Sequence, residues 1–541
     1  MTTVVLDQRL QNDLELLMNG GFTPLNGFMS KKDYESVLDN MHLANGQFFP
    51  LPINLYVEKK TADTIKDKVI LKDEQGFSLA IMDVSDVYMP DYDKECKLAY
   101  GTIDDNHPYV SLVMERKKKG MMYVGGVISQ QIQLPRHYDF KELRMTPKET
   151  KQYFKDNGWN TIVGFQTRNP MHKSHYELTL HALKQVGDDA KLHLMPAVGI
   201  TQLCDIEYHV RVKCYKELIK KYPKNTALLS LYPLSMRMAS SKEALLHALV
   251  RKNYGCTHFV IGRFHASPSY TTKEEKQFYG MYDAQELALK YEKEIGIKIV
   301  LSQNIVYVKE LNQYLPEDKV PKGMSVMNIS GTQQREMLKN NTSIPEWFSF
   351  SEVYELLQKE YNNMNKGMCL YLVGLSGAGK SATSMGLVER LRELYPERKV
   401  SVLDGDIIRQ HLSKGLGFSK EDRSANVRRI GYVASEITKH GGICIVANIA
   451  PFEDDRQANR NIINANGKYI EIFVDTGLKK CEERDCKGLY SGARNGSIKN
   501  FTGISSPFED PTNSEIVLKG ENTVDENVDT IINYCMSNNL L

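Results

Sequence analysis

Several features that would place this 541-residue chain in a special class are missing from it. Its nine cysteines are scattered and form no C-x-x-C pair, which argues against a disulfide framework or a structural zinc site and favours reduced thiols in a cytoplasmic protein. The net charge is only +2, so neither nucleic acid nor a membrane surface is expected as the main partner. No apolar run reaches membrane-spanning length, and no signal segment or low-complexity tract stands out. The remaining composition is typical of a globular, multidomain protein.

The order of β-prone and helical patterns divides the chain into three domains and a linker. Residues 1–135 alternate short β-prone runs with Gly and Pro-Asp turns, which predicts a mostly β module. From 136 to 345, strands alternate with helices, as in a parallel α/β domain. An apolar patch and a polar helix predict a linker at 346–365, and a second βα pattern occupies 366–541. The strand candidates of the second domain are Thr161–Phe165, Lys191–Val198, Ala227–Leu231, His258–Ile261 and Lys298–Leu301.

Residues 166–175, Gln-Thr-Arg-Asn-Pro-Met-His-Lys-Ser-His, lie between the first of these strands and an amphipathic run at 176–186. Asn169 suits a helix N-cap and Pro170 the first helical position. His172 and His175 are three residues apart and share one face of the first turn. A helix start with free N–H groups, two imidazoles and an arginine predicts a polyphosphate site. The alternative, that each histidine is an ordinary structural residue, fits a lone histidine better than this segment.

A second segment places more cations at the same kind of position. Arg263 and His265 follow the strand that ends at Ile261, and ligands bind at the C-terminal ends of strands in open α/β sheets. Arg237 follows another strand. Taken alone, each of these residues is as compatible with a structural ion pair as with a ligand.

Over about residues 1–350 the chain resembles ATP sulfurylase. The matching segments are Gly21–Met29, Tyr100–Pro108, Tyr123–Gly126, His137–Phe140, Gln166–His175, Arg251–His258, Gly262–Pro268, Tyr282–Glu286 and Asn328–Thr332. The resemblance implies a PUA-like β domain followed by a Rossmann-like nucleotidylyltransferase domain. It also implies that sulfate attacks the α-phosphate of ATP and that pyrophosphate leaves. Because sulfate is already an anion, catalysis would rest on positioning and charge stabilisation.

The resemblance also implies roles for individual residues. Gln166 and Arg168 would hold sulfate, with the Ala266 backbone nearby. The other site residues that the match indicates are Thr167 and Asn169 at the reacting phosphate, His172 and His175 at the phosphates, Arg263 at the nucleotide or leaving group, and His265 at the substrate. The chain departs from the family pattern in three loops, 195–202, 236–241 and 262–268, where Gln202, Phe264 and Ser267 are examples. These departures are compatible with altered kinetics, a divergent subfamily or a weakened first activity; the intact 166–175 segment favours activity.

A different phosphate motif begins at Gly374, where Gly-Leu-Ser-Gly-Ala-Gly-Lys-Ser follows a β-prone run and opens a helix. This is the context that a P-loop requires, so Lys380 is expected at the β- and γ-phosphates and Ser381 at Mg²⁺. Asp404 and Asp406 follow the next strand, as suits Mg²⁺ binding and proton acceptance, although such a pair alone is more often a turn. The expected phosphate-binding residues are Gly374, Leu375, Ser376, Gly377, Ala378, Gly379, Lys380, Ser381 and Thr383.

From about residue 366 to 541 the chain resembles adenylylsulfate (APS) kinase. The resemblance implies transfer of the ATP γ-phosphoryl group to the 3′-hydroxyl of APS, with Asp406 as the base and Asp404 near the metal. The residues that would bind APS are Arg409, Phe418, Arg423, Asn426, Lys487 and Phe501, the last by stacking on adenine. Ala450 stands where the family usually has serine, so it cannot accept a phosphoryl group, and Asn448 replaces a usual phenylalanine.

Three functional hypotheses follow. The leading one is a bifunctional homo-oligomeric enzyme that converts ATP and sulfate to APS and then phosphorylates APS to 3′-phosphoadenosine 5′-phosphosulfate (PAPS). In the second, the C-terminal domain is a regulatory nucleotide-binding module, as in fungal sulfurylases whose kinase-like domain lacks a working P-loop. In the third, a working kinase is fused to an impaired sulfurylase domain. The intact Lys380, Ser381, Asp404 and Asp406 favour the first.

Overall fold

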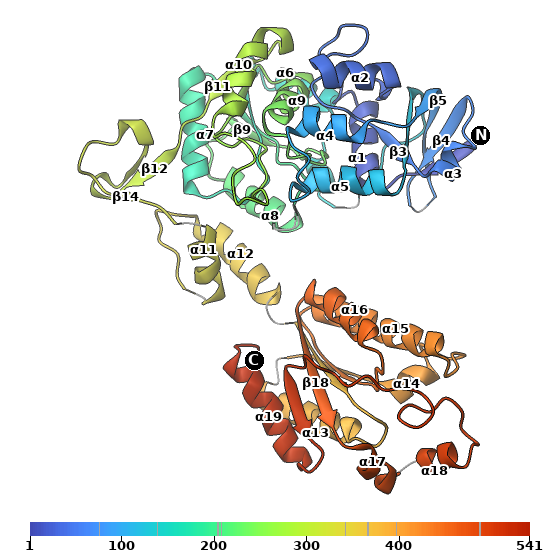
Figure 1. Ribbon diagram of the computed structural model, residues 1–541. Coiled ribbons are helices and arrows are strands. Elements are labelled where there is room, and N and C mark those ends of the chain that lie inside the picture. Colours follow the sequence, from blue (N-terminus) through green and yellow to red (C-terminus); the bar gives the residue numbers. More distant parts are fainter. Residues whose placement is uncertain are drawn as a thin grey trace. The chain divides into compact units, whose positions relative to one another are not determined.

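The computed structural model describes residues 1–74, 76–137, 139–202, 205–206, 208–329, 331–340, 342–364, 367–395, 398–485 and 488–541. The chain divides into two compact units, each with its own sheets and core (Figure 1). The first unit holds Met1–Met337 and Ser343–Leu357, and the second holds Leu338–Thr342 and Gln358–Leu541.

The N-terminal part of the first unit is a six-stranded mixed sheet in the order β1-β4-β5-β6-β2, with β3 also paired to β6. The strands are β1 (Thr2–Val5), β2 (Gly27–Phe28), β3 (Leu55–Val57), β4 (Lys68–Lys72), β5 (Ser78–Tyr88) and β6 (Met122–Gln131). The expectation of a mostly β module misses its helices, which are α1 (Gln8–Met18), α2 (Lys31–Asn40), α3 (Lys59–Ala62), α4 (Tyr92–Tyr100) and α5 (Pro108–Lys118). Strong local caps start several of them; for example, the Ser30 hydroxyl accepts from the Asp33 N–H at the start of α2.

The middle of the first unit is a five-stranded parallel sheet in the order β11-β10-β7-β8-β9, and all five strands lie where the sequence predicts them. They are β7 (Ile162–Phe165), β8 (Lys191–Leu194), β9 (Ala227–Leu229), β10 (His258–Ile261) and β11 (Lys298–Leu301). The helices around them are α6 (Pro147–Asp156), α7 (Lys173–Val186), α8 (Tyr208–Ile219), α9 (Ser240–Asn253) and α10 (Asp283–Ile295). Neighbouring strand residues face opposite layers: Val163 belongs to the core with α7 and α8, whereas Ile162 belongs to the core with α9 and α10.

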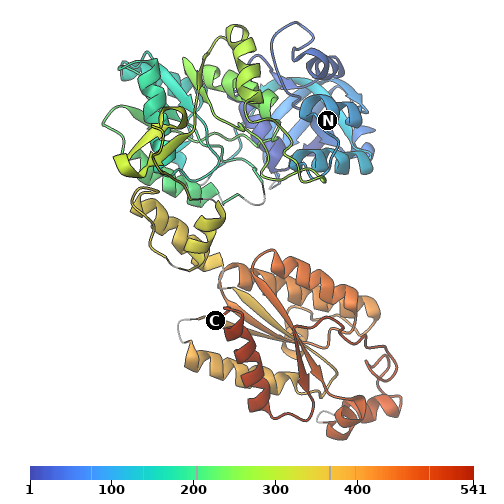
Figure 2. The ribbon, with the colours of Figure 1, turned by 60° about the vertical axis from the view of Figure 1, so that its left-hand side comes forward.

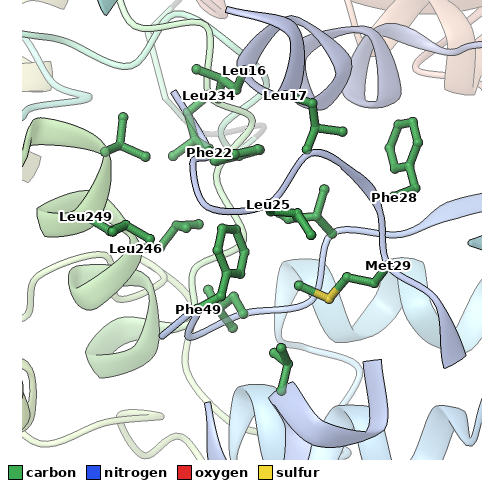
Figure 3. Close-up of a cluster of buried hydrophobic side chains, with 14 of the residues drawn as sticks. Leu16, Leu17, Phe22, Leu25, Phe28, Met29, Phe49, Leu234, Leu246 and Leu249 are labelled. Carbon is green, nitrogen blue, oxygen red and sulfur yellow. The ribbon is translucent and has the colours of Figure 1, made fainter. Parts of the chain in front are cut away.

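The N-terminal sheet and the parallel sheet share one hydrophobic core. Figure 3 shows Leu246 and Leu249 of α9 facing Phe22, Leu25 and other side chains of the N-terminal part. These residues are nearly or fully buried, so separating the two parts would expose a large apolar area to water. The N-terminal sheet and the parallel sheet therefore belong to one compact unit.

A small antiparallel sheet and two helices complete the first unit and lead to the second. The elements are β12 (Ile305–Val308), β13 (Gln313–Pro316), β14 (Val326–Met327), α11 (Gly331–Lys339) and α12 (Ser351–Met364), with short 3₁₀ turns at Lys309–Leu311 and Glu317–Lys319; a further 3₁₀ turn, Lys141–Leu143, precedes α6. Within the segment predicted to be a linker, Val353, Tyr354 and Leu357 of α12 are buried. The domain boundaries at 135, 345 and 365 stay predictions.

The second unit is a three-layer sandwich around a five-stranded parallel sheet in the order β16-β17-β15-β18-β19 (Figure 2). Its strands are β15 (Met368–Val373), β16 (Val400–Asp404), β17 (Ile443–Ala447), β18 (Lys468–Asp475) and β19 (Ile516–Lys519). Its helices are α13 (Lys380–Leu394), α14 (Gly405–Gln410), α15 (Lys420–Lys439), α16 (Glu453–Asn464), α17 (Leu478–Arg484), α18 (Leu489–Arg494) and α19 (Val524–Ser537). On β15, Leu370 and Leu372 pack with α13 and α19, whereas Tyr371 and Val373 pack with α15. The central strand is thus buried on both faces, as its continuous apolar run predicts.

Two bulk expectations can be compared with the described part of the chain. Among those residues, no helix is long and apolar enough to cross a bilayer. The seven cysteines that the structure describes are all free and buried, and Cys204 and Cys486 lie outside the described residues.

Candidate active sites

The first site lies at the C-terminal edge of the parallel sheet, where the loop after β7 meets the loop after the neighbouring strand β10. The helix after β7 begins later than predicted: α7 starts at Lys173 with His172 as its N-cap, not at Pro170 with Asn169 as the cap. One long-range hydrogen bond and one local hydrogen bond keep residues 167–169 out of the helix. The Tyr215 hydroxyl donates to the Asn169 carbonyl (2.7 Å), and the Thr167 hydroxyl accepts from the Asn169 N–H (3.1 Å), which holds 167–169 as a separate turn.

Arg168 is held by hydrogen bonds on both terminal nitrogens. Its Nη1 donates to both carboxylate oxygens of Asp205 at 3.0 and 3.2 Å, and its Nη2 donates to the Ser267 carbonyl at 3.0 Å and the Ser269 hydroxyl at 3.4 Å. Gln202 completes the group, since its Oε1 accepts from the Ser269 N–H (2.8 Å) and its Nε2 lies 3.5 Å from Asp205 Oδ1. Residues of all three segments, after β7, β8 and β10, therefore converge on the guanidinium group.

Gln166 points to a buried histidine pair. Its Nε2 is 3.4 Å from Nε2 of His247, whose Nδ1 is 3.0 Å from Nε2 of His265. Both rings are in the protein interior, and burial lowers the pKa of both imidazoles. Glu243, one turn before His247 on α9, caps that helix by accepting from the N–H groups of Arg237 and Ala239. His265 is thus a buried, neutral partner within hydrogen-bond reach of a second imidazole.

His172 and His175 stand together at the start of α7, with ring centroids 6.3 Å apart. Burial lowers the pKa of His172 to about 3 and also lowers the pKa of His175, so both are neutral at physiological pH. The sequence suggested free backbone N–H groups at this helix start, but two of them are occupied. The Lys173 N–H donates to the Phe348 carbonyl (3.1 Å), and the His172 N–H donates to Nδ1 of His175 (3.3 Å). This end of the helix therefore carries two neutral imidazoles, and at least two of its backbone N–H groups are already occupied.

The loops that depart from the family pattern contact each other. The Ser240 N–H donates to the Ala266 carbonyl (3.2 Å), and Phe264, Ala266, Met238 and Ser240 all have positive φ, between 42° and 57°. Such backbone is costly without glycine and is found where a site needs a fixed shape.

The two arginines near these loops have different positions. Arg263 is partly exposed and lies 3.7 Å from Glu317. Arg237 is fully buried in an ion pair with Asp13 of the N-terminal part, 2.7 Å apart. Of the two roles that the sequence left open for Arg237, this is the structural ion pair and not the ligand.

The second site is the P-loop between β15 and α13. Gly377 and Gly379 have φ of 74° and 109°, a backbone region that favours glycine. Side chains hold the loop carbonyls from outside: the Tyr490 hydroxyl donates to the Ser376 carbonyl (2.8 Å), and Arg484 donates to the carbonyls of Gly377 and Ala378 (3.2 and 3.3 Å). Carbonyls turned outward leave the peptide N–H groups to line the concave side, which is how such loops bind phosphate.

Lys380, Ser381 and Asp404 form the polar end of this loop. Lys380 Nζ donates to the carbonyls of Gly374 and Leu375 (2.9 and 2.8 Å). The Ser381 hydroxyl donates to Oδ2 of Asp404 (2.8 Å), while Oδ1 of Asp404 accepts from the Asp406 N–H (2.9 Å) at the start of α14. A hydroxyl and a carboxylate side by side next to a phosphate loop supply the oxygen ligands that Mg²⁺ prefers. Thr383 is buried in the first turn of α13.

The expected APS residues surround Phe418, whose ring is 58% exposed. The guanidinium groups of Arg409 and Arg423 lie 4.5 and 5.6 Å from the ring centroid. Arg423 also donates to Thr502 and to the Asn500 carbonyl, which connects it to the loop that carries Phe501. Phe501 is nearly buried and packs edge-on against Tyr490. Asn426 is buried on α15. Lys487 lies outside the described residues.

A cavity of about 580 Å³ lies beside the P-loop, between the end of β18 and the loop at 503–510. Leu375, Phe473 and Phe508 are among the residues that line it. None of the described residues expected to bind APS is among those that line it.

The sequence did not indicate several residues that contact the site residues. They are Asp205, Ser269, His247, Gln334, Ser349 and Arg484. Acidic and amide side chains are common on loops, so composition alone offered no signal for them. Only Asp205 had a local hint, because it lies three residues after Gln202, just beyond the divergent loop at 195–202.

Fold and sites together are those of a transferase with two candidate phosphate sites, one in each unit. Family models agree: a PUA-like domain matches residues 1–132, ATP-sulfurylase matches 141–360, and adenylylsulphate kinase matches 366–519. The chain is 42% identical to a sulfate adenylyltransferase of Gibberella zeae, covering 100% of this chain and 94% of that protein, and 42% identical to one of Chaetomium globosum, covering 96% and 91%. A hexameric APS kinase from Thiobacillus denitrificans matches with a TM-score of 0.78 and 30% identity, over 100% of this chain and 94% of that one. The chain therefore belongs to the sulfate adenylyltransferase family and carries both a sulfurylase domain and an APS kinase domain.

Proposed function

We propose that the protein activates sulfate in two steps, forming APS from ATP and sulfate and then PAPS from APS and a second ATP. The observation that supports this proposal is that each unit has its own candidate phosphate site: the 166–175 segment in the first, and a P-loop with Lys380, Ser381 and Asp404 in the second. A regulatory domain without catalysis would not need the hydroxyl–carboxylate pair beside its phosphate loop.

In the first step, a sulfate oxygen forms a bond to the α-phosphorus of ATP and pyrophosphate leaves. Gln166, Arg168 and the Ala266 backbone would hold sulfate, and Thr167 and Asn169 would contact the reacting phosphate. The leaving group would take hydrogen bonds from His172 and His175 and charge from Arg263. Neutral imidazoles suit this role, because an N–H donor aimed at developing charge needs no proton transfer.

In the second step, the 3′-hydroxyl of APS attacks the γ-phosphorus of ATP and ADP leaves. Asp406 would accept the hydroxyl proton. Mg²⁺, held through Ser381 and Asp404, would neutralise charge on the phosphates when bound. Lys380 would leave its loop carbonyls for the β- and γ-phosphates. The exposed Phe418 ring and the arginines beside it would hold APS, together with Asn426, Lys487 and Phe501.

One experiment separates this proposal from the two alternatives. The purified protein is incubated with ATP, Mg²⁺, labelled sulfate and pyrophosphatase, and the products are resolved. PAPS supports the two-step enzyme, and APS alone supports a regulatory C-terminal domain. PAPS from supplied APS but none from sulfate supports an impaired sulfurylase domain, which the Arg168–Asp205 ion pair makes the stronger alternative. Lys380→Ala should stop the pathway at APS, and His172→Ala should block it before APS.

We further propose a cytoplasmic homo-oligomer. The seven described cysteines are free and buried, as expected of a reducing compartment, and one similar structure is of a hexameric enzyme. Size-exclusion chromatography with light scattering measures the assembly directly; a monomer at micromolar concentration would contradict it.

A further inference from the structure

The imidazole of His172 is enclosed by a segment that lies far along the chain. Its Nδ1 is 2.9 Å from the Ser349 hydroxyl, and its Nε2 is 3.1 Å from the amide nitrogen of Gln334. The Phe348 ring packs on it with centroids 4.5 Å apart and an interplanar angle of 30°. Ser349 itself is only 2% exposed. Both ring nitrogens and one face of the imidazole are therefore fixed by residues 334–349.

These contacts determine where the proton lies on each histidine. The Gln334 amide nitrogen can only donate, so Nε2 of His172 must accept, and its single proton must be on Nδ1, donated to Ser349. His175 has the opposite tautomer: its Nδ1 accepts from the His172 backbone N–H, which leaves its proton on Nε2. His175 is thus ready to donate to an anion through Nε2, and His172 is not.

A phosphate oxygen can only accept, so binding it at Nε2 of His172 requires two changes. The Gln334 amide must leave, and the imidazole must gain a proton from water at Nε2 and lose its Nδ1 proton to water, so that the ring is neutral before and after the exchange. Ser349 permits this because a hydroxyl is both donor and acceptor: it accepts from Nδ1–H in one state and donates to the bare Nδ1 in the other. A residue that could only accept would hold His172 in the tautomer that rejects phosphate.

We propose that Ser349 is a positioning residue for the first reaction, which sets the tautomer of His172, and that Gln334 occupies the place of a phosphate oxygen until the nucleotide binds. The inference rests on the proposed function only in taking His172 as a phosphate ligand. It adds a coupling between the 334–349 segment and nucleotide binding. The nucleotide displaces Gln334, while Ser349 and Phe348 keep the His172 ring in place.

The direct test is the tautomer itself, read from two-bond ¹H–¹⁵N spectra of the full-length protein labelled at the histidine rings. The His172 signals are identified by their absence in His172→Gln. Without ligand we expect the Nδ1–H form of His172, and with saturating pyrophosphate the Nε2–H form. An Nε2–H form in the free protein, a tautomer that does not change at saturation, or no pyrophosphate binding would each overturn the proposal.

Two variants test the partners separately. Ser349→Ala leaves Nδ1 without a partner in a buried site and should lower kcat/KM for ATP in APS formation about tenfold, whereas Ser349→Thr keeps the hydroxyl and should restore most of it. Gln334→Leu should act in the opposite direction and lower the KM for ATP, and the free protein should lose its preference for Nδ1–H. Equal loss in Ser349→Ala and Ser349→Thr would mean a packing role and contradict the proposal.

These readouts also separate this proposal from the proposed function. Conversion of supplied APS to PAPS uses the other unit and should be unchanged in every variant, which controls for folding. If the wild-type protein made no APS but His172 changed tautomer with pyrophosphate, the tautomer device would stand and the sulfurylase activity would fail.

Discussion

Arg168 and Asp205 form a nearly buried ion pair in which one terminal nitrogen of the guanidinium donates to both carboxylate oxygens, at 3.0 and 3.2 Å. Their side chains are only 14% and 6% exposed, so water screens the pair weakly. Arg168 is the proposed ligand for sulfate. Asp205 therefore competes with a dianionic substrate for the same positive charge.

Removing the negative charge of Asp205 should help sulfate to bind. In Asp205→Asn, the side chain can still accept one hydrogen bond, and Nη2 of Arg168 remains fixed by the Ser267 carbonyl. We expect the KM for sulfate to fall about fivefold with little change in kcat. Initial rates of APS formation at varied sulfate measure this. Asp139→Asn, which breaks the Arg144 ion pair outside the site, is the matched control. A rise in KM would show that Asp205 orients Arg168 and does not compete with substrate.

Because Gln202 is uncharged, the Asp205 carboxylate relies on Arg168 for a positive partner. The amide of Gln202 contacts the carboxylate but brings no charge, with Nε2 3.5 Å from Oδ1 and the backbone N–H 3.3 Å from Oδ2. Gln202→Lys places a cation beside the Asp205 carboxylate. The ion pair between Asp205 and Arg168 should then weaken, and the KM for sulfate should fall about threefold. Gln202→Met has similar length and no charge, and should not lower it. An unchanged KM in both variants would separate the divergent loop from sulfate affinity.

Sequence patterns predicted what is contiguous along the chain. The five strands of the middle sheet are where apolar runs placed them, and the P-loop was complete in eight residues. Strand ends then indicated that the loops after β7 and β10 meet, because parallel strands end at the same edge. Family resemblance supplied residue roles that no pattern could give.

What the sequence could not predict depends on tertiary contacts. Ser349 is 177 residues from His172, and Asp205 is 37 from Arg168, so no local period links them. The start of α7 was wrong for a similar reason: Asn169 and Pro170 have good capping and first-turn preferences, but Tyr215 of α8 holds the Asn169 carbonyl in a turn. Local preference is a weak guide where a tertiary contact fixes the backbone.

In the kinase domain, the exposed ring of Phe418 is expected to bind APS. An aromatic side chain that is 58% exposed and lies between two arginines offers a stacking surface for a nucleotide base. Phe418→Ala should raise the KM for APS about tenfold, since base stacking contributes about 1–3 kcal/mol. APS formation from sulfate should be unchanged. Tyr432→Ala removes an exposed aromatic of α15, the helix that follows Phe418, and an equal effect there would argue against a specific role for Phe418.

The contact between Ser381 and Asp404 predicts a magnesium effect confined to the kinase. Ser381→Ala removes one proposed Mg²⁺ ligand and the donor to Asp404 Oδ2. We expect the Mg²⁺ concentration that gives half-maximal PAPS formation from APS to rise about tenfold, as for loss of a ligand-shell partner. Ser384→Ala, on the same helix, is the control. An unchanged Mg²⁺ dependence would exclude Ser381 as a ligand.

Buried histidines should make the first unit sensitive to mild acid. Burial lowers the pKa of His172 and of His193 to about 3, whereas an unfolded histidine titrates near 6.5. Between these values the unfolded chain binds more protons than the folded one, so stability falls as pH decreases from about 6.5 toward 3. At pH 5 the loss is about 2 kcal/mol for each residue.

Tryptophan fluorescence can follow this loss in the first unit alone, because both tryptophans, Trp159 and Trp347, belong to it. In a unit of this size, the two groups should together lower the thermal midpoint seen by fluorescence by about 5 °C between pH 7 and pH 5. His193→Gln removes one of these groups, so its midpoint should fall less over the same range than that of the wild type, even if the variant is less stable at pH 7. His193 contacts Ser230 and Cys256 deep in the sheet, away from the proposed ligands, so this variant tests burial without altering the phosphate site. A midpoint that stays constant from pH 7 to pH 5 would mean that these rings are protonated or accessible in the folded protein.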